Sequence, residues 1–306
     1  MDRVLIGDNQ FFGINHMSEE KARTQAMRFR DLAAIIEVLD AAYAEGIKTF
    51  MCTTHERIAQ VCDHVRANRD RYPDYKFYPC MPYAHKYANA ATEHGVVGAI
   101  RSFLPEENAL GALLSGGMSL ARKDIQRLAE LLIDAEMKMF TGLDTPAIFL
   151  QNVATDFLLG LGFDEAFRIF AEHVRDRYRA EPGFITMNAP RLLARLEKVG
   201  IANPLICTNI NKLGFRMCGG MAAYEEMMMH GNCRLIAMSV FASGALPAEQ
   251  ALEYVCRFPQ IRSIVFGASS RANIAQTRQL IEKLTPFPDE PRLSVPAAVA
   301  TGRDGR

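Results

Sequence analysis

The chain has 306 residues, of which 49% are hydrophobic, and its 35 basic and 35 acidic side chains give no formal net charge. This length can bury a large core, while the neutral balance argues against a nucleic-acid or anionic-membrane surface. Seven cysteines are scattered without a CxxC spacing, and no signal-like start or apolar run of 18 residues occurs. We expect a soluble cytoplasmic protein, compatible with a homo-oligomer, that binds a small-molecule substrate and neither nucleic acid nor membrane.

Short apolar strands alternate with amphipathic helices along the chain. A first strand over 4–7 is followed by a polar loop and then by a helix that ends at Gly46. Eight such units over about 285 residues favour an α/β fold, a closed (β/α)8 TIM barrel, over the alternative of a doubly wound open sheet. The later strands are predicted over 47–53, 77–81, 147–153, 183–188, 204–209, 235–241 and 263–267.

Two segments depart from this alternation. Residues 86–146 contain two helical patterns around a Gly116–Gly117 break and no strand, which predicts a helical insertion between strands 3 and 4, near the barrel mouth. Residues 286–306 are rich in proline, glycine and charge, which is typical of a disordered tail. The predicted organisation is therefore one barrel domain over 1–285 that carries the insertion.

Polar residues follow the predicted strands at their carboxyl ends, where barrels of this kind place their active sites. Asp8, His55, Tyr83 and Asn152 come from four different units and are the candidates for acid–base chemistry and substrate hydrogen bonding. The alternatives are a helix cap for His55 and packing on the barrel rim for Tyr83. The residues at the strand ends predict a mouth that is rich in amides and poor in carboxylates.

A zinc site is a further alternative at the second and third strands. Cys52, His55, Cys80 and His85 are residue types that bind zinc, and neighbouring strand ends carry them. Their spacing lacks the tight local pairs of known zinc motifs, and cysteine is common in protein cores. We therefore expect no metal.

The last predicted strand ends in a candidate phosphate site. The segment over 262–271 reads as a buried strand, a glycine turn, two hydroxyls and a cation that opens a helix. Backbone N–H groups at Ser269 and Ser270 and the positive end of the helix dipole would attract an anion. Gly267 would allow close approach, and Arg271 would add charge. The alternative is an ordinary serine N-cap that binds no ligand.

The same segment, Ile264–Arg271, resembles the NADP-phosphate segment of the aldo-keto reductases. Ala237–Leu246 is similar to the seventh-strand segment that cradles the cofactor pyrophosphate in that family. The strand spacing matches over roughly the whole barrel, and the specific motifs lie in the final third. The resemblance implies an NADP(H)-dependent oxidoreductase of a small carbonyl or sugar-like substrate. The cofactor-binding residues that it implies, or that it shares with the phosphate site, are Asn188, Asn209, Ser239, Gly244, Gly267, Ser269, Ser270 and Arg271.

The catalytic residues of that family are not matched. Its Asp, Lys and His belong at the second, third and fourth strand ends, where this chain has Cys52–Thr54, Cys80–Pro82 and Gln151–Asn152. Met238 stands for the aromatic residue that stacks on nicotinamide, and the N-terminal hairpin that plugs the barrel is missing. A second function therefore stays open, a non-redox lyase or isomerase that uses the phosphate site for a phosphorylated small molecule.

Overall fold

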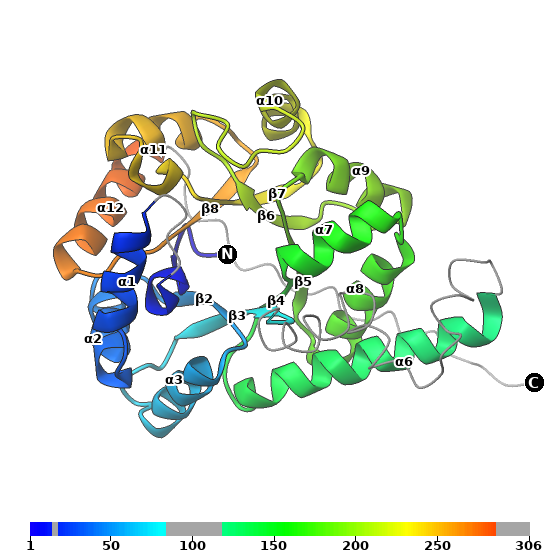
Figure 1. Cartoon of the computed structure of the whole chain (residues 1–306), viewed down its shortest axis with the longest axis horizontal. Helices are drawn as coiled ribbons and strands as arrows, with labels where there is room; N and C mark the ends of the chain where they lie inside the picture. The colour runs from blue at the N-terminus through cyan, green and yellow to red at the C-terminus, as the bar shows by residue number, and fades with distance from the viewer. Residues whose placement is uncertain (14–17, 84–117, 286–306) are drawn as a thin grey trace, which may run out of the picture.

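The protein is seen in a computed structural model that describes residues 1–13, 18–83 and 118–285. Its strands form a closed barrel in which each pairs in parallel with its neighbours in sequence, and β8 pairs with β1. Figure 1 shows the strands as an inner ring inside a ring of helices. The predicted TIM-barrel fold is thus confirmed. The strands are β1 (Val4–Gly7), β2 (Thr49–Thr53), β3 (Lys76–Met81), β4 (Ala147–Leu150), β5 (Glu181–Thr186), β6 (Leu205–Asn209), β7 (Arg234–Met238) and β8 (Ile261–Phe266).

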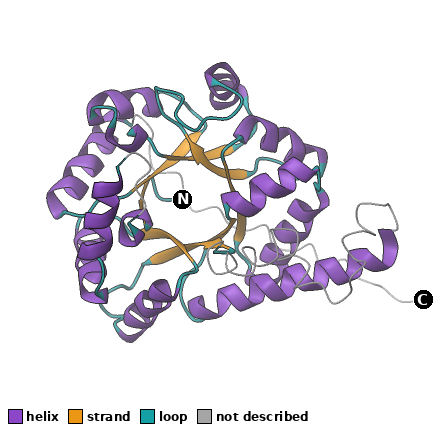
Figure 2. Ribbon diagram, viewed as in Figure 1, coloured by secondary structure: helices purple, strands orange, loops and turns teal. Residues whose placement is uncertain are grey.

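Helices cover the outside of the barrel, as Figure 2 shows. Most are amphipathic: α2 buries Ile35, Val38, Leu39 and Ala42 on one face, the spacing expected for a helix on a sheet. The described helices are α1 (Glu19–Arg28), α2 (Leu32–Ala44), α3 (Glu56–Ala67), α6 (Met118–Met137), α7 (Asn152–Leu161), α8 (Glu165–Tyr178), α9 (Ala189–Lys198), α10 (Met221–His230), α11 (Ala248–Cys256) and α12 (Arg271–Leu284), with the 3-10 helices η1 (Asn9–Phe12), η2 (Lys138–Phe140) and η3 (Ala242–Gly244).

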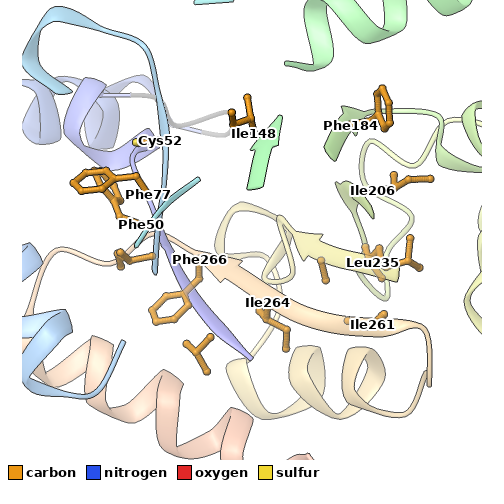
Figure 3. Close-up of a cluster of buried hydrophobic side chains, with 14 of the residues drawn as sticks. Phe50, Cys52, Phe77, Ile148, Phe184, Ile206, Leu235, Ile261, Ile264 and Phe266 are labelled. Atoms are coloured by element: carbon orange, nitrogen blue, oxygen red, sulfur yellow. The ribbon is translucent and has the colours of Figure 1, made fainter. Parts of the chain in front are cut away.

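The strands carry apolar side chains on both faces, and these form two separate cores. One cluster fills the barrel interior and includes Met51, Phe149 and Ile185. The other lies between strands and helices and includes Phe50 and Phe77, which Figure 3 labels. Because successive side chains of a strand point to opposite faces, a strand buried on both sides reads as the continuous apolar run seen in the sequence.

Several predicted boundaries are wrong, among them the ends of β4, β5 and β7. β4 ends at Leu150, and the predicted strand to 153 fails because Asn152 already begins α7. The sequence after this strand predicts a long helical region to about Ala180, and the structure divides it into α7 and α8 because Gly162 ends α7 in a left-handed conformation (φ 70°). β7 ends at Met238 rather than at 241, since Ser239 has φ 55° and cannot continue a strand.

The predicted insertion is described only in part. α6 and η2 fall within 86–146, and α6 packs against α8 on the outside of the barrel. Residues 84–117, which include the Gly116–Gly117 break, lie outside the described residues, as does the predicted tail over 286–306.

Ion pairs line the amino end of the barrel. The resemblance to the aldo-keto reductases implies that the N-terminal hairpin that plugs the barrel in that family is missing from this chain. Lys76 Nζ lies 3.0 Å from the Asp2 carboxylate, and Arg234 pairs with Glu181. The Thr49 hydroxyl also donates to Asp2. Burial favours a raised Asp2 pKa, but the bonds from Thr49 and Lys76 outweigh it, so the pKa is lowered. This end of a barrel contributes stability rather than catalysis.

We predict that Asp2→Asn lowers the free energy of unfolding by about 1–3 kcal/mol near neutral pH, the range for lost hydrogen bonds to a charged group. The folded-state pKa of Asp2 lies below its unfolded value, so its contribution is present above the unfolded pKa and is lost as pH falls through the folded one. Denaturant titrations of both proteins near pH 7 and below pH 3 check this. A difference that stays constant with pH would contradict it.

Candidate functional site

The mouth of the barrel is built around Asp8, the residue that follows β1. Its Oδ2 accepts hydrogen bonds from the backbone N–H and the hydroxyl of Thr53, both at 2.7 Å. Only 5% of Asp8 is exposed, and burial raises its pKa although the two Thr53 bonds oppose the shift. Thr53 is the last residue of β2. Asp8, which follows β1, therefore places a carboxylate at the end of β2, where Cys52–Thr54 provides none.

Three rings pack against one another near the ends of β1, β2 and β3, and the charge of Asp8 acts on one of them, Tyr83. The His55 ring centroid lies 4.5 Å from that of Phe12 and 5.1 Å from that of Tyr83. His55 is also the N-cap of α3, since its Nδ1 accepts a hydrogen bond from the Arg57 backbone N–H at 3.0 Å. A neutral ring with an accepting Nδ1 carries its proton on Nε2, which makes Nε2 a donor. The structure thus brings Asp8, His55 and Tyr83 together.

Tyr83 stands between opposite charges. Burial raises the pKa of its phenol, Asp8 adds to the shift, and the positive charge of Arg57 opposes it. The Arg57 guanidinium is fixed by donating to the carbonyl oxygens of Phe29 and Phe11 at 2.8 and 3.2 Å. Neither Phe12 nor Arg57 was predicted from the sequence as a site residue. The position of Arg57, two residues after His55 in the first turn of a helix, was the available signal.

Two further carboxylates reach the strand ends from helices. Glu136 of α6 is 1% exposed and accepts a hydrogen bond from the Thr54 hydroxyl. Asp156 of α7 accepts from the Thr186 hydroxyl and, at 3.0 Å, from the Met187 N–H, and burial raises its pKa. Both side chains come from the helical layer, which the residues at the strand ends do not indicate. The expectation of a mouth poor in carboxylates rests on strand ends alone and stays a prediction.

The amides at β5 and β6 help to order their own loops. Asn209 is 1% exposed, and its Nδ2 donates to the Arg216 carbonyl oxygen at 3.2 Å and to the Met187 sulfur at 3.1 Å. Asn188 is half-buried, and its backbone N–H donates to the Thr186 hydroxyl at 2.9 Å. Both amides lie on the carboxyl side of the barrel, as predicted. Their implied contacts with a nicotinamide stay a prediction.

The turn after β7 has an unusual backbone. Ser239, Ala242 and Ser243 have φ of 55°, 46° and 58°, and Gly244 has φ of 90°. These are three of the six non-glycine residues with positive φ in the described part of the chain. Such residues cost free energy and cluster at ligand clamps and active sites. The strained turn coincides with the segment that the resemblance implies for pyrophosphate binding.

The turn after β8 meets the first 3-10 helix. Gln10 is 4% exposed, and its Nε2 donates to the Gly7 carbonyl oxygen at 2.8 Å. Its Oε1 is buried and has no hydrogen-bond partner among the described residues. A Cβ on Gly267 would come within 2.3 Å of this oxygen, so only glycine allows the approach. Gln10 thus lies beside the predicted phosphate site, a contact that the sequence does not indicate because β1 and β8 meet only when the barrel closes.

The N-terminus of α12 completes this turn. The Ser270 hydroxyl accepts from the Asn273 N–H at 3.3 Å, so the serine N-cap, which was the alternative to a phosphate site, is present. Arg28 of α1 donates to the Ser269 carbonyl oxygen. The Arg271 guanidinium lies against α2, with its Nε 3.1 Å from Glu45 Oε1. Phosphate binding at Ser269, Ser270 and Arg271 stays a prediction, and Arg271 would have to turn from Glu45 to take part.

The remaining candidates are Asn152 and the alternative zinc ligands. Asn152 is the first residue of α7 and is half-buried, and no described hydrogen bond joins it to Asp8, His55 or Tyr83. Cys52 packs in the outer core beside Phe50 and Phe77 (Figure 3), whereas Cys80 lies inside the barrel. Within the described residues no group of three or more His, Cys, Asp or Glu side chains could hold a metal ion, and His85 lies outside them.

The fold resembles solved structures of aldo-keto reductases. A proposed aldo-keto reductase of Pseudomonas aeruginosa matches with a TM-score of 0.59 and 12% identity, covering 92% of this chain and 90% of its own. An aldo-keto reductase from a Medee basin deep-sea metagenome matches with a TM-score of 0.52 and 10% identity, covering 95% of this chain and 94% of its own. An aldo-keto reductase from Brucella melitensis matches with a TM-score of 0.50 and 11% identity, covering 93% of this chain and 94% of its own.

At the level of sequence, no protein-family model and no curated protein matches the chain. Among the described helices, none combines the length and the apolar character that spanning a membrane requires. The structural matches cover nearly the whole chain at identities of 10–12%, which establishes a shared fold. The chain therefore has the barrel fold of the aldo-keto reductases.

Proposed function

We propose that the protein is an NADP(H)-linked oxidoreductase that reduces a small carbonyl or sugar-like substrate to an alcohol. The observation that carries the proposal is the placement of Tyr83 at the barrel mouth, against His55 and within the field of Asp8 and Arg57. A phenol, a charge partner and a histidine at this position are what carbonyl reduction needs: a proton donor and groups that orient the oxygen. The shared fold supports the same chemistry by analogy.

In the proposed reaction, Tyr83 gives its phenolic proton to the carbonyl oxygen of the substrate and regains a proton from solvent. A bound NADPH would supply the hydride for the carbonyl carbon, so that an alcohol and NADP+ would be the products. His55 Nε2–H holds the carbonyl oxygen beside the phenol. Arg57 stabilises the transient phenolate, because a cation near a phenol favours its ionised form. Asp8, fixed by Thr53, orients the polar groups around them.

The turns after β7 and β8 fit a dinucleotide. The left-handed residues from Ser239 to Gly244 open the backbone toward a pyrophosphate, as the resemblance implies. Gly267 and the N-terminus of α12 offer room and backbone donors for a second phosphate. Gln10 Oε1 is an acceptor suited to a ligand hydroxyl. Asn188, two residues after β5, and Asn209, the last residue of β6, are the proposed nicotinamide contacts.

The cofactor site is tested by Arg271→Ala. We predict that the variant binds NADPH more weakly by about 1.5–3 kcal/mol, the range for a hydrogen bond to a charged group, and that NADH binding changes little because NADH lacks the 2′-phosphate. Stability should be nearly unchanged, since the Arg271 side chain is 69% exposed. Titrations that follow tyrosine fluorescence quenching and nicotinamide fluorescence with both nucleotides measure the effect.

Arg23→Ala is the control, because Arg23 is an exposed cation of α1 that pairs with Glu19. It should leave both affinities unchanged. If the unsubstituted protein binds neither nucleotide but does bind phosphorylated metabolites, the oxidoreductase proposal is wrong and the lyase or isomerase alternative gains support. If Arg271→Ala binds NADPH as the unsubstituted protein does, Arg271 is only the first residue of a capped helix.

A further inference from the structure

Glu45 is the carboxylate nearest the proposed phosphate-binding arginine. It caps the C-terminus of α2, and its side chain is only 16% exposed. Two cations of α12 meet it: Arg271 Nε at 3.1 Å from Oε1, and Arg278 Nε at 4.0 Å from Oε2. Arg278 has a second partner on its own helix, Glu282, at 2.5 Å. Arg271 is therefore one of two cations that share a mostly buried carboxylate.

The turn above this pair has features of a ligand site beyond those of a helix N-terminus. Gln10 is only 4% exposed, and its Oε1, which has no hydrogen-bond partner among the described residues, faces Gly267. A buried acceptor without a partner costs free energy that a ligand donor would recover. A ribose carries both a hydroxyl donor and, when phosphorylated, an anion. The turn thus combines a hydroxyl acceptor from η1 with the anion-attracting end of α12.

We propose that Glu45 is a specificity-determining residue that lowers the affinity of this turn for a phosphorylated ribose by holding the Arg271 guanidinium against α2. The inference rests on the proposed cofactor site. A ligand phosphate and the Glu45 carboxylate compete for the same guanidinium, so binding the phosphate includes the cost of breaking the Arg271–Glu45 pair. A ribose without the phosphate does not compete. Glu45 therefore reduces the ratio between the affinity for the phosphorylated dinucleotide and the affinity for the unphosphorylated one.

The exchange is feasible because the two partners are unequal. The Arg271 side chain is 69% exposed and has room to change rotamer, whereas the Glu45 side chain is only 16% exposed and stays in place. When Arg271 leaves, Arg278 remains beside Glu45, so the buried carboxylate keeps a compensating charge. The pair that is broken is a partly exposed one, which bounds its strength to the range of surface ion pairs. The effect of Glu45 on affinity is therefore a factor of about two to five.

The test is Glu45→Gln, which removes the charge and keeps the shape. We expect it to tighten NADPH binding about two- to fivefold and to leave NADH binding unchanged. Glu282→Gln is the matched control, because it removes the same charge from the same group of side chains but from a residue that pairs with Arg278. In the double variant Glu45→Gln/Arg271→Ala the gain should disappear, since no guanidinium is left to release.

Equal tightening by Glu45→Gln and Glu282→Gln would show a general charge effect and overturn the inference, as would no tightening in either. A gain that survives removal of Arg271 would also overturn it. If the unsubstituted protein binds neither nucleotide, the proposed function fails separately. The same variants are then titrated with inorganic phosphate by 31P NMR: tightening in Glu45→Gln alone supports the role of Glu45, and unchanged affinity contradicts it.

Discussion

Tyr83→Phe is expected to lower kcat for carbonyl reduction by about 10²- to 10⁴-fold, the contribution of a positioned proton donor, and to leave NADPH affinity unchanged. The substitution removes one oxygen from a residue that is partly accessible at the mouth and keeps the ring that meets His55 at 5.1 Å and Phe12 at 6.4 Å. Packing is thus conserved and only the proton is lost. NADPH oxidation with a panel of small aldehydes and ketones measures the loss.

The protonation state of Tyr83 adds a second measurement. Burial and Asp8 raise the pKa of the phenol above the ordinary value of 10.0, with Arg57 opposing them. The phenol therefore keeps its proton throughout the neutral range, and reduction should decline only at strongly alkaline pH. Arg57→Met removes the opposing charge and should move this decline to still higher pH. A decline near neutral pH would assign the proton to another group, with His55 the first candidate.

Tyr254→Phe is the matched control for the tyrosine prediction. Tyr254 lies on α11, where its hydroxyl donates to Glu225 at 3.0 Å, away from the mouth. The same loss of one hydroxyl there should change stability slightly and kcat not at all. If Tyr83→Phe reduces carbonyls as fast as this control does, Tyr83 is a packing residue of the rim and the proposed mechanism is wrong.

The barrel itself could be predicted because its signal is local. Each strand is a short apolar run, each helix has a buried face, and eight alternations suit a closed barrel. The boundary at β4 could not be predicted in this way. Residues 151–153 continue the strand pattern, but the Gln151 N–H donates to the Met81 carbonyl oxygen and α7 begins at the next residue. The boundary is set by the start of α7, where the Gln151 carbonyl oxygen accepts the Thr155 N–H, and the apolar periodicity of the strand does not show where that helix begins.

The residues of the candidate site could be predicted from the sequence only where they come shortly after a strand in the chain. Asp8, His55 and Tyr83 lie where the barrel geometry predicts. Cys52 was misplaced because adjacent strand residues face opposite sides: Thr53 bonds Asp8 at the mouth, and Cys52 therefore faces the helices. Glu136 had no signal, since it is one charged residue of a long helix and only its contact with Thr54 brings it to the strand end.

Gly183 shows how far the interior constrains the sequence. It lies in β5 directly opposite Phe149 of β4, and both are inside the barrel. A Cβ on Gly183 would come within 2.2 Å of the Phe149 ring, which also packs on the Tyr78 ring with a centroid distance of 5.6 Å. Real Cβ atoms do not approach a ring so closely, so the ring would have to move. Tyr78 restricts that movement, and close-packed interiors resist it.

Gly183→Ala is therefore expected to lower the free energy of unfolding by about 3 kcal/mol, the upper part of the range for overpacking. Gly160→Ala is the control: nothing lies within 4 Å of its Cβ position in α7, so alanine should be neutral or stabilise by up to about 1 kcal/mol. The double variant Gly183→Ala/Phe149→Leu gives the new methyl group room and should recover part of the loss. Denaturant titrations measure all three. Equal stabilities of the two alanine variants would mean that the Phe149 ring moves aside freely, and the barrel interior would then be more loosely packed than the contact between Phe149 and Gly183 implies.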